Sequence, residues 1–235
     1  MIDGVLLVDK AARMTSHDVV AITRRVLNTR KVGHCGTLDP LATGLLIITI
    51  GRGTKIQDLL MSEDKEYMGT IRLGQVTASQ DADGEVTAEN PVPDLTHGQI
   101  AEAFAKFQGD FYQTPPMVSA IKKDGVPLYK LARQGRTVER EPRLVHVYGH
   151  EIFGVNLPDV EFRVVCSKGF YVRTYAHDIG QILGCGGHLK ALRRTASGKF
   201  RVDGVLTVDE LRTLPLDEIK SRILSLPQVS RLRGT

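Results

Sequence analysis

The chain has 235 residues, of which 42% are hydrophobic, so it can form one large domain or two small ones with a substantial core. No apolar run approaches the roughly 18 residues of a membrane span, and no basic start precedes a long apolar segment. Three cysteines without a Cys-x-x-Cys pair argue against a disulfide framework or a zinc site and favour a cytoplasmic protein. The net charge of +4 and the pI of about 9.0 favour an anionic partner.

Sequence patterns in the first half of the chain predict alternating helices and strands. Thr15 or Ser16 can cap a helix that runs to about Leu27. The apolar run at residues 45–50 predicts a buried strand, and residues 67–73 predict another. Residues 81–84, Asp-Ala-Asp-Gly, predict a turn, since they lack the spaced ligands of a calcium loop.

The next segment changes in composition. Thr96 and Gln99 form a capping box for a helix through Phe107. Residues 110–142 are rich in Lys, Arg, Gln, Gly and Pro, with Tyr112 among a few isolated large side chains. This composition suits an exposed excursion from a sheet better than core, and an ordinary surface loop is the alternative.

Sequence patterns in the last third of the chain predict a strand and two helices. Residues 160–166 are strand-like, and a helix is expected from Tyr171 to Leu183, ended by Gly184. Thr207 and Glu210 form a second capping box. Because strands and helices interleave without regular βαβ spacing, we expect an α+β fold with a mixed, largely antiparallel sheet flanked by helices. We expect one domain over residues 1–235, with an insertion at about 110–142 and a C-terminal helical part at about 205–235.

The most informative stretch is residues 33–44, Gly-His-Cys-Gly-Thr-Leu-Asp-Pro-Leu-Ala-Thr-Gly. It places the single carboxylate of Asp39 on a loop before the apolar strand. Pro40 favours an extended Asp39, and Gly36 and Gly44 permit turns closed to other residues. A carboxylate held in this way is well placed for catalysis, although the pattern alone favours an Asp that closes a turn. Four basic residues lie upstream: Arg24, Arg25, Arg30 and Lys31.

The pattern Gly-His-x-Gly-x-Leu-Asp-Pro-x-Ala-x-Gly-x-Leu resembles the catalytic motif of the bacterial TruB-type tRNA pseudouridine synthases. The resemblance continues at residues 4–10, 65–74, 113–122, 132–135, 166–174 and 192–194. It implies the pseudouridine-synthase fold, in which residues 110–142 grip RNA. It also implies isomerisation of uridine to pseudouridine at position 55 in the T-loop of tRNA, with the T-arm as the partner.

The resemblance assigns catalytic roles to three residues. Asp39 corresponds to the essential carboxylate, which either attacks the base or sugar or removes a ribose proton. Arg173 corresponds to the guanidinium that keeps this carboxylate charged and oriented, and Tyr67 to a tyrosine that packs against the target base. A surface charge on a helix and a half-buried strand tyrosine are the ordinary structural interpretations of Arg173 and Tyr67.

Substrate-binding roles follow in the same way. His34 corresponds to a histidine that fills the space left by the flipped nucleotide, and Tyr171 and Leu192 to residues that close the uracil pocket. Helix core is an alternative for Leu192. A solvated surface is an equal alternative for the candidate phosphate contacts, which are Lys55, Lys122, Lys123, Arg133 and Arg136.

The implied chemistry breaks the bond between uracil N1 and the ribose, turns the base, and rejoins it through C5. Because it involves no redox change and no external group, the resemblance implies no metal, nucleotide or organic cofactor. The target base must leave its stack, at a cost of a few kcal/mol.

The chain departs from the family pattern in two places. Residues 11–13, Ala-Ala-Arg, stand where relatives usually carry Pro-x-Gly, so the turn is expected to be less constrained. The additional C-terminal RNA-binding domain of many relatives is expected to be absent. We expect a monomer with no membrane contact and no obligate protein partner, since no apolar heptad is evident.

Three other functions compete with this interpretation. One is a guide-RNA-dependent synthase subunit, and another is an RNA-binding chaperone that refolds tRNA. A glycosidase is weaker, because it normally needs a second carboxylate about 5–9 Å from the first.

Overall fold

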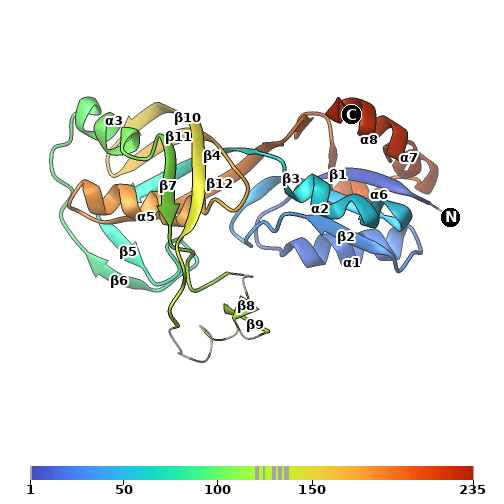
Figure 1. The fold of residues 1–235 in the computed structure, drawn as a ribbon, viewed down its shortest axis with the longest axis horizontal. Coiled ribbons are helices and arrows are strands. Elements are labelled where there is room, and N and C mark those ends of the chain that lie inside the picture. Colours follow the sequence, from blue (N-terminus) through green and yellow to red (C-terminus); the bar gives the residue numbers. More distant parts are fainter. Residues whose placement is uncertain are drawn as a thin grey trace. The chain divides into compact units, whose positions relative to one another are not determined.

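The computed structural model describes residues 2–119, 122–123, 125–128, 131, 134 and 138–234. Its contacts divide the chain into two compact units (Figure 1). The first unit comprises Met1–Met68 and Leu192–Thr235, and the second comprises Gly69–Ala191. The predicted single catalytic domain over 1–235 stays a prediction.

The first unit is a sheet with helices packed on it. Its strand order is β14-β1-β3-β12, with β2 added to β3 and β13 added to β12. β1 pairs in parallel with β14, and β3 in parallel with β12, whereas β1–β3, β2–β3 and β12–β13 are antiparallel. The strands are β1 (Gly4–Lys10), β2 (Val32–Cys35), β3 (Thr43–Ile50), β13 (Phe200–Arg201) and β14 (Leu206–Thr207), with parts of β4 (Lys65–Leu73) and β12 (Gly187–Ser197). The helices are α1 (Ser16–Val26), η1 (Gly51–Ile56), α2 (Gln57–Met61), α6 (Val208–Thr213), α7 (Leu216–Ser221) and α8 (Leu226–Arg233).

Burial explains why the apolar run at residues 45–50 forms a central strand. Leu45 and Ile47 of β3 are fully buried in a core cluster that also contains Val5 of β1, Leu60 of α2 and Val229 of α8. Full burial of such a side chain contributes about 1.5–3 kcal/mol. Helix α8 therefore helps to complete the core in which β3 is buried.

The second unit has the strand order β12-β4-β11-β10-β7. β10 pairs antiparallel with both β7 and β11. These strands are β7 (Gly109–Gln113), β10 (Arg143–Asn156) and β11 (Asp159–Cys166), with the rest of β4 and β12. Two further pairs are β5 (Gln75–Thr77) with β6 (Val86–Glu89) and β8 (Lys122–Lys123) with β9 (Val126–Pro127); the helices are α3 (His97–Ala105) and α5 (Val172–Ile182).

An aromatic cluster forms the core of the second unit. Tyr175 of α5 is fully buried, and its ring lies 5.3–5.8 Å from the rings of Phe104, Phe107, Phe162 and Phe170. Edge-to-face and tilted contacts of this kind add about 0.5–1.5 kcal/mol per pair beyond burial. They fix α5 and, with it, the residues at its N-terminus.

The predicted α+β fold with a mixed, largely antiparallel sheet is confirmed. Two expectations need correction. Leu192 lies in strand β12, so helix core is wrong for it. The excursion begins later than residue 110, because residues 110–113 belong to β7 and pair with β10.

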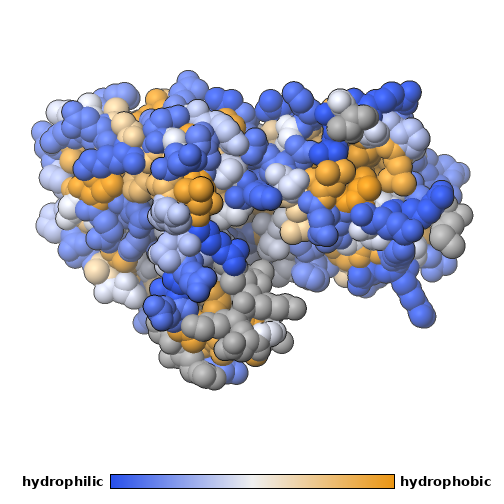
Figure 2. Space-filling model, in the orientation of Figure 1, coloured by the Kyte–Doolittle hydropathy of each residue, from blue (hydrophilic) through white to orange (hydrophobic). Residues whose placement is uncertain are grey.

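The surface drawn in Figure 2 is mostly hydrophilic, with hydrophobic patches among the polar side chains. Large apolar side chains that are exposed include Leu59 and Met61 in the first unit, and Tyr112 and Leu144 in the second. Among the residues that the structure describes, none of the helices has the length and apolar character needed to cross a membrane.

Candidate active site

Asp39 lies half-buried on the loop at residues 36–42, which joins β2 to β3. Its carbonyl accepts a hydrogen bond from the backbone N–H of Ala42 at 3.0 Å. The preceding residue, Leu38, is held on both sides by the buried hydroxyl of Ser16. That oxygen accepts from the Leu38 N–H at 2.8 Å and donates to the Leu38 carbonyl at 3.1 Å. The first turn of α1 thus fixes the backbone next to Asp39.

The residue after Asp39 is fixed from the end of β1 and the turn that follows it. The Pro40 carbonyl accepts from the Arg13 N–H at 2.8 Å, and the Lys10 ammonium lies 3.5 Å away. Lys10 is fully buried and also donates to the carbonyls of Ala11 and Met14 at 2.8 Å each. Arg13 has a φ of 63°, in the left-handed region that favours glycine, so this turn is strained where we expected only a looser one.

Both ends of the loop turn at glycines, as predicted. Gly36 has a φ of 81° and Gly44 a φ of 100°. The guanidinium of Arg194 donates to the carbonyl of Gly36 at 3.1 Å and to that of Leu45 at 2.7 Å. Arg194 belongs to the family resemblance at residues 192–194, but that resemblance assigned it no role.

His34 lies in β2, five residues before Asp39. Burial, the largest cause, and the positive charges of His17 and Arg194 together lower the pKa of His34 from 6.5 to about 4. The rings of His17 and His34 meet edge to face, with centroids 5.1 Å apart. His34 is therefore a neutral ring at physiological pH, which suits contact with a base.

The other predicted residues of the first unit lie on different elements. Tyr67 is buried in β4, and Leu192 is half-buried in β12, where its carbonyl accepts from the Thr43 hydroxyl at 3.4 Å. Leu192 thus lies beside the start of β3, where the Asp39 loop ends. Lys55 is exposed in η1, which follows the opposite end of β3.

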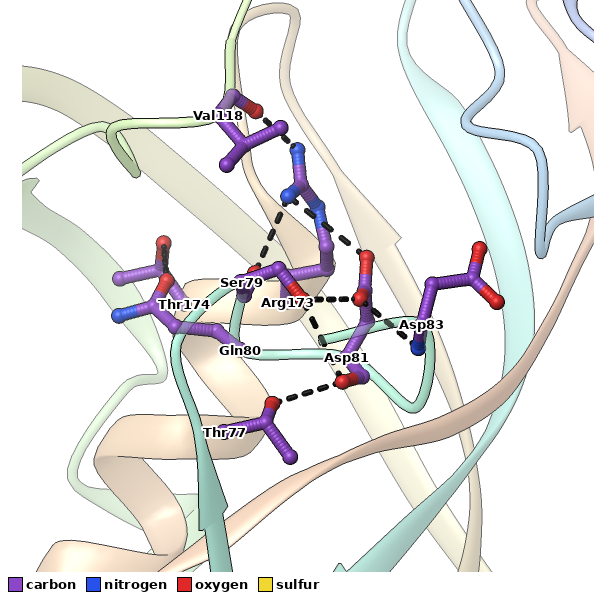
Figure 3. Close-up of polar contacts among 8 residues, drawn as sticks. All are labelled: Thr77, Ser79, Gln80, Asp81, Asp83, Val118, Arg173 and Thr174. Atoms are coloured by element: carbon purple, nitrogen blue, oxygen red, sulfur yellow. Dashed lines mark hydrogen bonds and ion pairs between the residues drawn. The ribbon is translucent and has the colours of Figure 1, made fainter. Parts of the chain in front are cut away.

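Arg173 lies in the first turn of α5 in the second unit and is buried (Figure 3). Its guanidinium donates to the carbonyls of Ser79 at 3.1 Å and Val118 at 2.7 Å. One nitrogen also lies 3.7 Å from an Asp81 carboxylate oxygen. A buried cation is costly without such partners, so the surface-charge interpretation of Arg173 is wrong.

Asp81 is itself buried, in the turn that the sequence predicts for residues 81–84 (Figure 3). Its carboxylate accepts from the Ser79 hydroxyl and from the Asp83 N–H, the latter at 3.2 Å. Its carbonyl accepts from the Thr77 hydroxyl at 2.7 Å. The sequence predicted the turn but gave no sign of the ion pair, since Asp81 and Arg173 meet only through tertiary folding.

Tyr171 precedes α5 and is half-buried. Its backbone exchanges two hydrogen bonds with the side-chain amide of Gln113 in β7, at 2.8 and 3.1 Å. The N-terminus of α5 is therefore tied to the strand from which the insertion departs. Lys122 contributes its backbone to β8, and Arg133 lies outside the described residues.

The comparisons with known proteins agree with this arrangement. Residues 24–172 match the model for the TruB family pseudouridylate synthase N-terminal domain. Residues 173–226 match the model for the tRNA pseudouridylate synthase B C-terminal domain. Together the two matches cover residues 24–226, so the chain belongs to the class of pseudouridylate synthases.

Similar proteins and solved structures identify the family within this class of enzymes. The chain is 58% identical to the tRNA pseudouridine synthase B of Opitutus terrae, over 97% of this chain and 95% of that protein. It is 46% identical to that of Francisella philomiragia, over 97% and 76%. A crystal structure of a Cbf5-Nop10-Gar1 complex matches with a TM-score of 0.74 and 29% identity, over 97% of this chain and 62% of that one. The chain belongs to the TruB family.

Proposed function

We propose that this protein isomerises uridine 55 in the T-loop of tRNA to pseudouridine. Membership of the TruB family supports the reaction class, and the relatives' names support tRNA as the substrate. The observation that carries the proposal is the Asp39 loop, whose backbone is fixed directly before and after the carboxylate. A catalytic group held within a narrow range of positions is what a reaction of this kind requires.

The reaction needs no external group. The N1–C1′ bond breaks, the C5–C1′ bond forms, C5 loses a proton and N1 gains one. We propose that Asp39 supplies the essential carboxylate and that Tyr67 packs against the uracil. The neutral ring of His34 and the side chains of Leu192 and Tyr171 would line the space around the flipped nucleotide.

Arg173 is proposed to supply a guanidinium to this reaction. Its motif position supports the role, and so does its burial in the first turn of α5. A guanidinium lowers the pKa of a neighbouring carboxyl and fixes its orientation. Replacing Arg173 with Lys keeps the charge but removes the forked geometry, so we expect slower isomerisation with little change in tRNA affinity.

Phosphate contacts complete the proposal. Lys55 is exposed and suited to this role, and Lys122 and Arg133 are proposed on their sequence positions alone. Such contacts make affinity dependent on salt. Exchanging Lys55 for Glu should weaken tRNA binding and reduce its salt dependence, without changing the rate of the bound complex.

The first test incubates unmodified tRNA transcript with the protein alone, with Asp39→Asn, and with the exposed control Asp58→Asn. Pseudouridine is mapped by chemical derivatisation and primer extension. A stop at position 55 with the wild type and Asp58→Asn, but not with Asp39→Asn, supports the reaction and its carboxylate.

Two other outcomes contradict the proposal. Tight binding of tRNA by all three proteins without pseudouridine would favour the RNA chaperone. Pseudouridine that forms only after addition of a guide RNA would favour the guide-dependent subunit.

A further inference from the structure

Arg194 connects the two sides of the Asp39 loop. Its side chain is 1% exposed and lies in β12, far along the chain from the loop. Nε donates to the Leu45 carbonyl at 2.7 Å, and an Nη donates to the Gly36 carbonyl at 3.1 Å. One planar group therefore holds the backbone three residues before Asp39 and six residues after it.

The backbone of Arg194 makes a second contact with the loop. Arg194 pairs in parallel with Gly44, and a Cβ at Gly44 would lie 2.3 Å from the Arg194 carbonyl oxygen. A Cβ at Gly36 would lie 3.2 Å from an Arg194 Nη. The two glycines that flank Asp39 thus provide turns and also leave room for this one arginine.

Arg194 is a charged side chain that is almost fully buried, which is unusual. In the described part of the chain its partners are carbonyl oxygens, and it makes no ion pair. Burying a cation without a counter-ion is costly, so a merely structural clamp would be served as well by a neutral donor. The positive charge acts locally, because it helps to lower the pKa of His34.

We propose that Arg194 is a positioning residue for isomerisation, which holds the backbone on both sides of Asp39 and places a positive charge between the Gly36 and Leu45 carbonyls. This proposal rests on the proposed function. Arg194 does not need to touch the uridine, and it acts through the backbone that carries Asp39. Displacement of a catalytic group by about 1 Å can cost about 100-fold in rate.

The experiment compares Arg194→Lys with Arg201→Lys at a temperature where circular dichroism shows both to be folded. Arg201 is an exposed arginine of the same unit that pairs with Glu66 at 3.2 Å. An ammonium cannot span both carbonyls, so single-turnover isomerisation by Arg194→Lys should fall about 10- to 100-fold. Its Kd for tRNA should stay within about twofold, and Arg201→Lys should match the wild type.

A second measurement does not depend on activity. Arg194→Gln removes the charge, so the pKa of His34, followed by NMR titration, should rise from about 4. If the Arg194 variants do not fold, Gly36→Ala crowds the same contact from the other end and should show the same loss of rate at unchanged affinity.

Several outcomes would overturn the proposal. A folded Arg194→Lys with the wild-type rate would do so, as would a His34 pKa that stays unchanged in Arg194→Gln. A normal rate in Gly36→Ala would also contradict it. If the wild type makes pseudouridine and Arg194→Lys does so equally well, only this inference fails; if the wild type makes none, the proposed function itself fails.

Discussion

Ser16 offers a direct test of how firmly the Asp39 loop is anchored. In Ser16→Ala both the N–H and the carbonyl of Leu38 lose their hydroxyl partner, at a site where Ser16 is 1% and Leu38 3% exposed. Each buried polar group left unpaired costs about 1–3 kcal/mol. Since water cannot easily reach the site, we expect a loss of about 2–4 kcal/mol in the free energy of unfolding.

For a chain of this length, 1 kcal/mol corresponds to about 2–4 °C in Tm, so the Tm should fall by about 4–16 °C. Because Leu38 precedes Asp39, single-turnover isomerisation should also slow by about tenfold at a temperature where the variant is folded. Scanning calorimetry and the primer-extension assay measure the two effects.

The matched control is Ser62→Ala. The Ser62 hydroxyl donates to the Leu59 carbonyl at 2.8 Å, but at an exposed position, so its loss should change stability by less than about 0.5 kcal/mol. If Ser16→Ala keeps both the Tm and the rate of the wild type, the inference that Ser16 anchors the loop is refuted.

Three further changes test the surroundings of the loop. The φ of 63° at Arg13 costs about 1–2 kcal/mol of backbone strain, which Arg13→Gly relieves. Because the greater flexibility of glycine in the unfolded chain offsets part of this, we expect the free energy of unfolding in urea to rise by about 0.5–1 kcal/mol. Arg13→Ala keeps the strain and should show no gain. His34 has a pKa of about 4 when folded against 6.5 when unfolded, so the stability due to its neutral ring is complete above pH 6.5 and is lost as the pH falls towards 4. Between pH 7 and pH 5 the free energy of unfolding of the wild type should fall by about 1–2 kcal/mol more than that of His34→Gln. If the unfolding free energies of the two proteins change with pH in parallel, the inference that His34 is a buried neutral ring is contradicted. Gly44→Ala would place a Cβ 2.3 Å from a backbone oxygen of Arg194, so it should cost more than about 3 kcal/mol in unfolding free energy. Gly204→Ala, with a φ of 69° and no atom within 4 Å of the new Cβ, should cost only about 1 kcal/mol, and equal losses would refute the steric argument.

Local elements were predictable because neighbouring residues determine them. The capping boxes at Thr96 and Thr207 form as expected, and so does the buried strand that follows the Asp39 loop. The turns at Gly36 and Gly44 follow from the conformational freedom of glycine. The resemblance to a family added roles for side chains that no local pattern could have supplied.

Side chains that act across the fold were the ones that sequence analysis missed or misjudged. Helix core was the alternative interpretation of Leu192, which lies instead in strand β12, where the next two residues, Arg193 and Arg194, pair with β3. Asp81 looked like an ordinary turn residue, and its burial beside Arg173 depends on the packing of α5.

By itself, the sequence determined the family, the order of the elements and the loop that carries Asp39. Tertiary structure alone decided what holds that loop. Arg194 lies 158 residues from its partner Gly36, and Arg173 lies 94 residues from its partner Ser79. Such partners meet only after strands distant in sequence have paired, and burial then makes their hydrogen bonds obligatory, because the groups have no water to replace a lost partner.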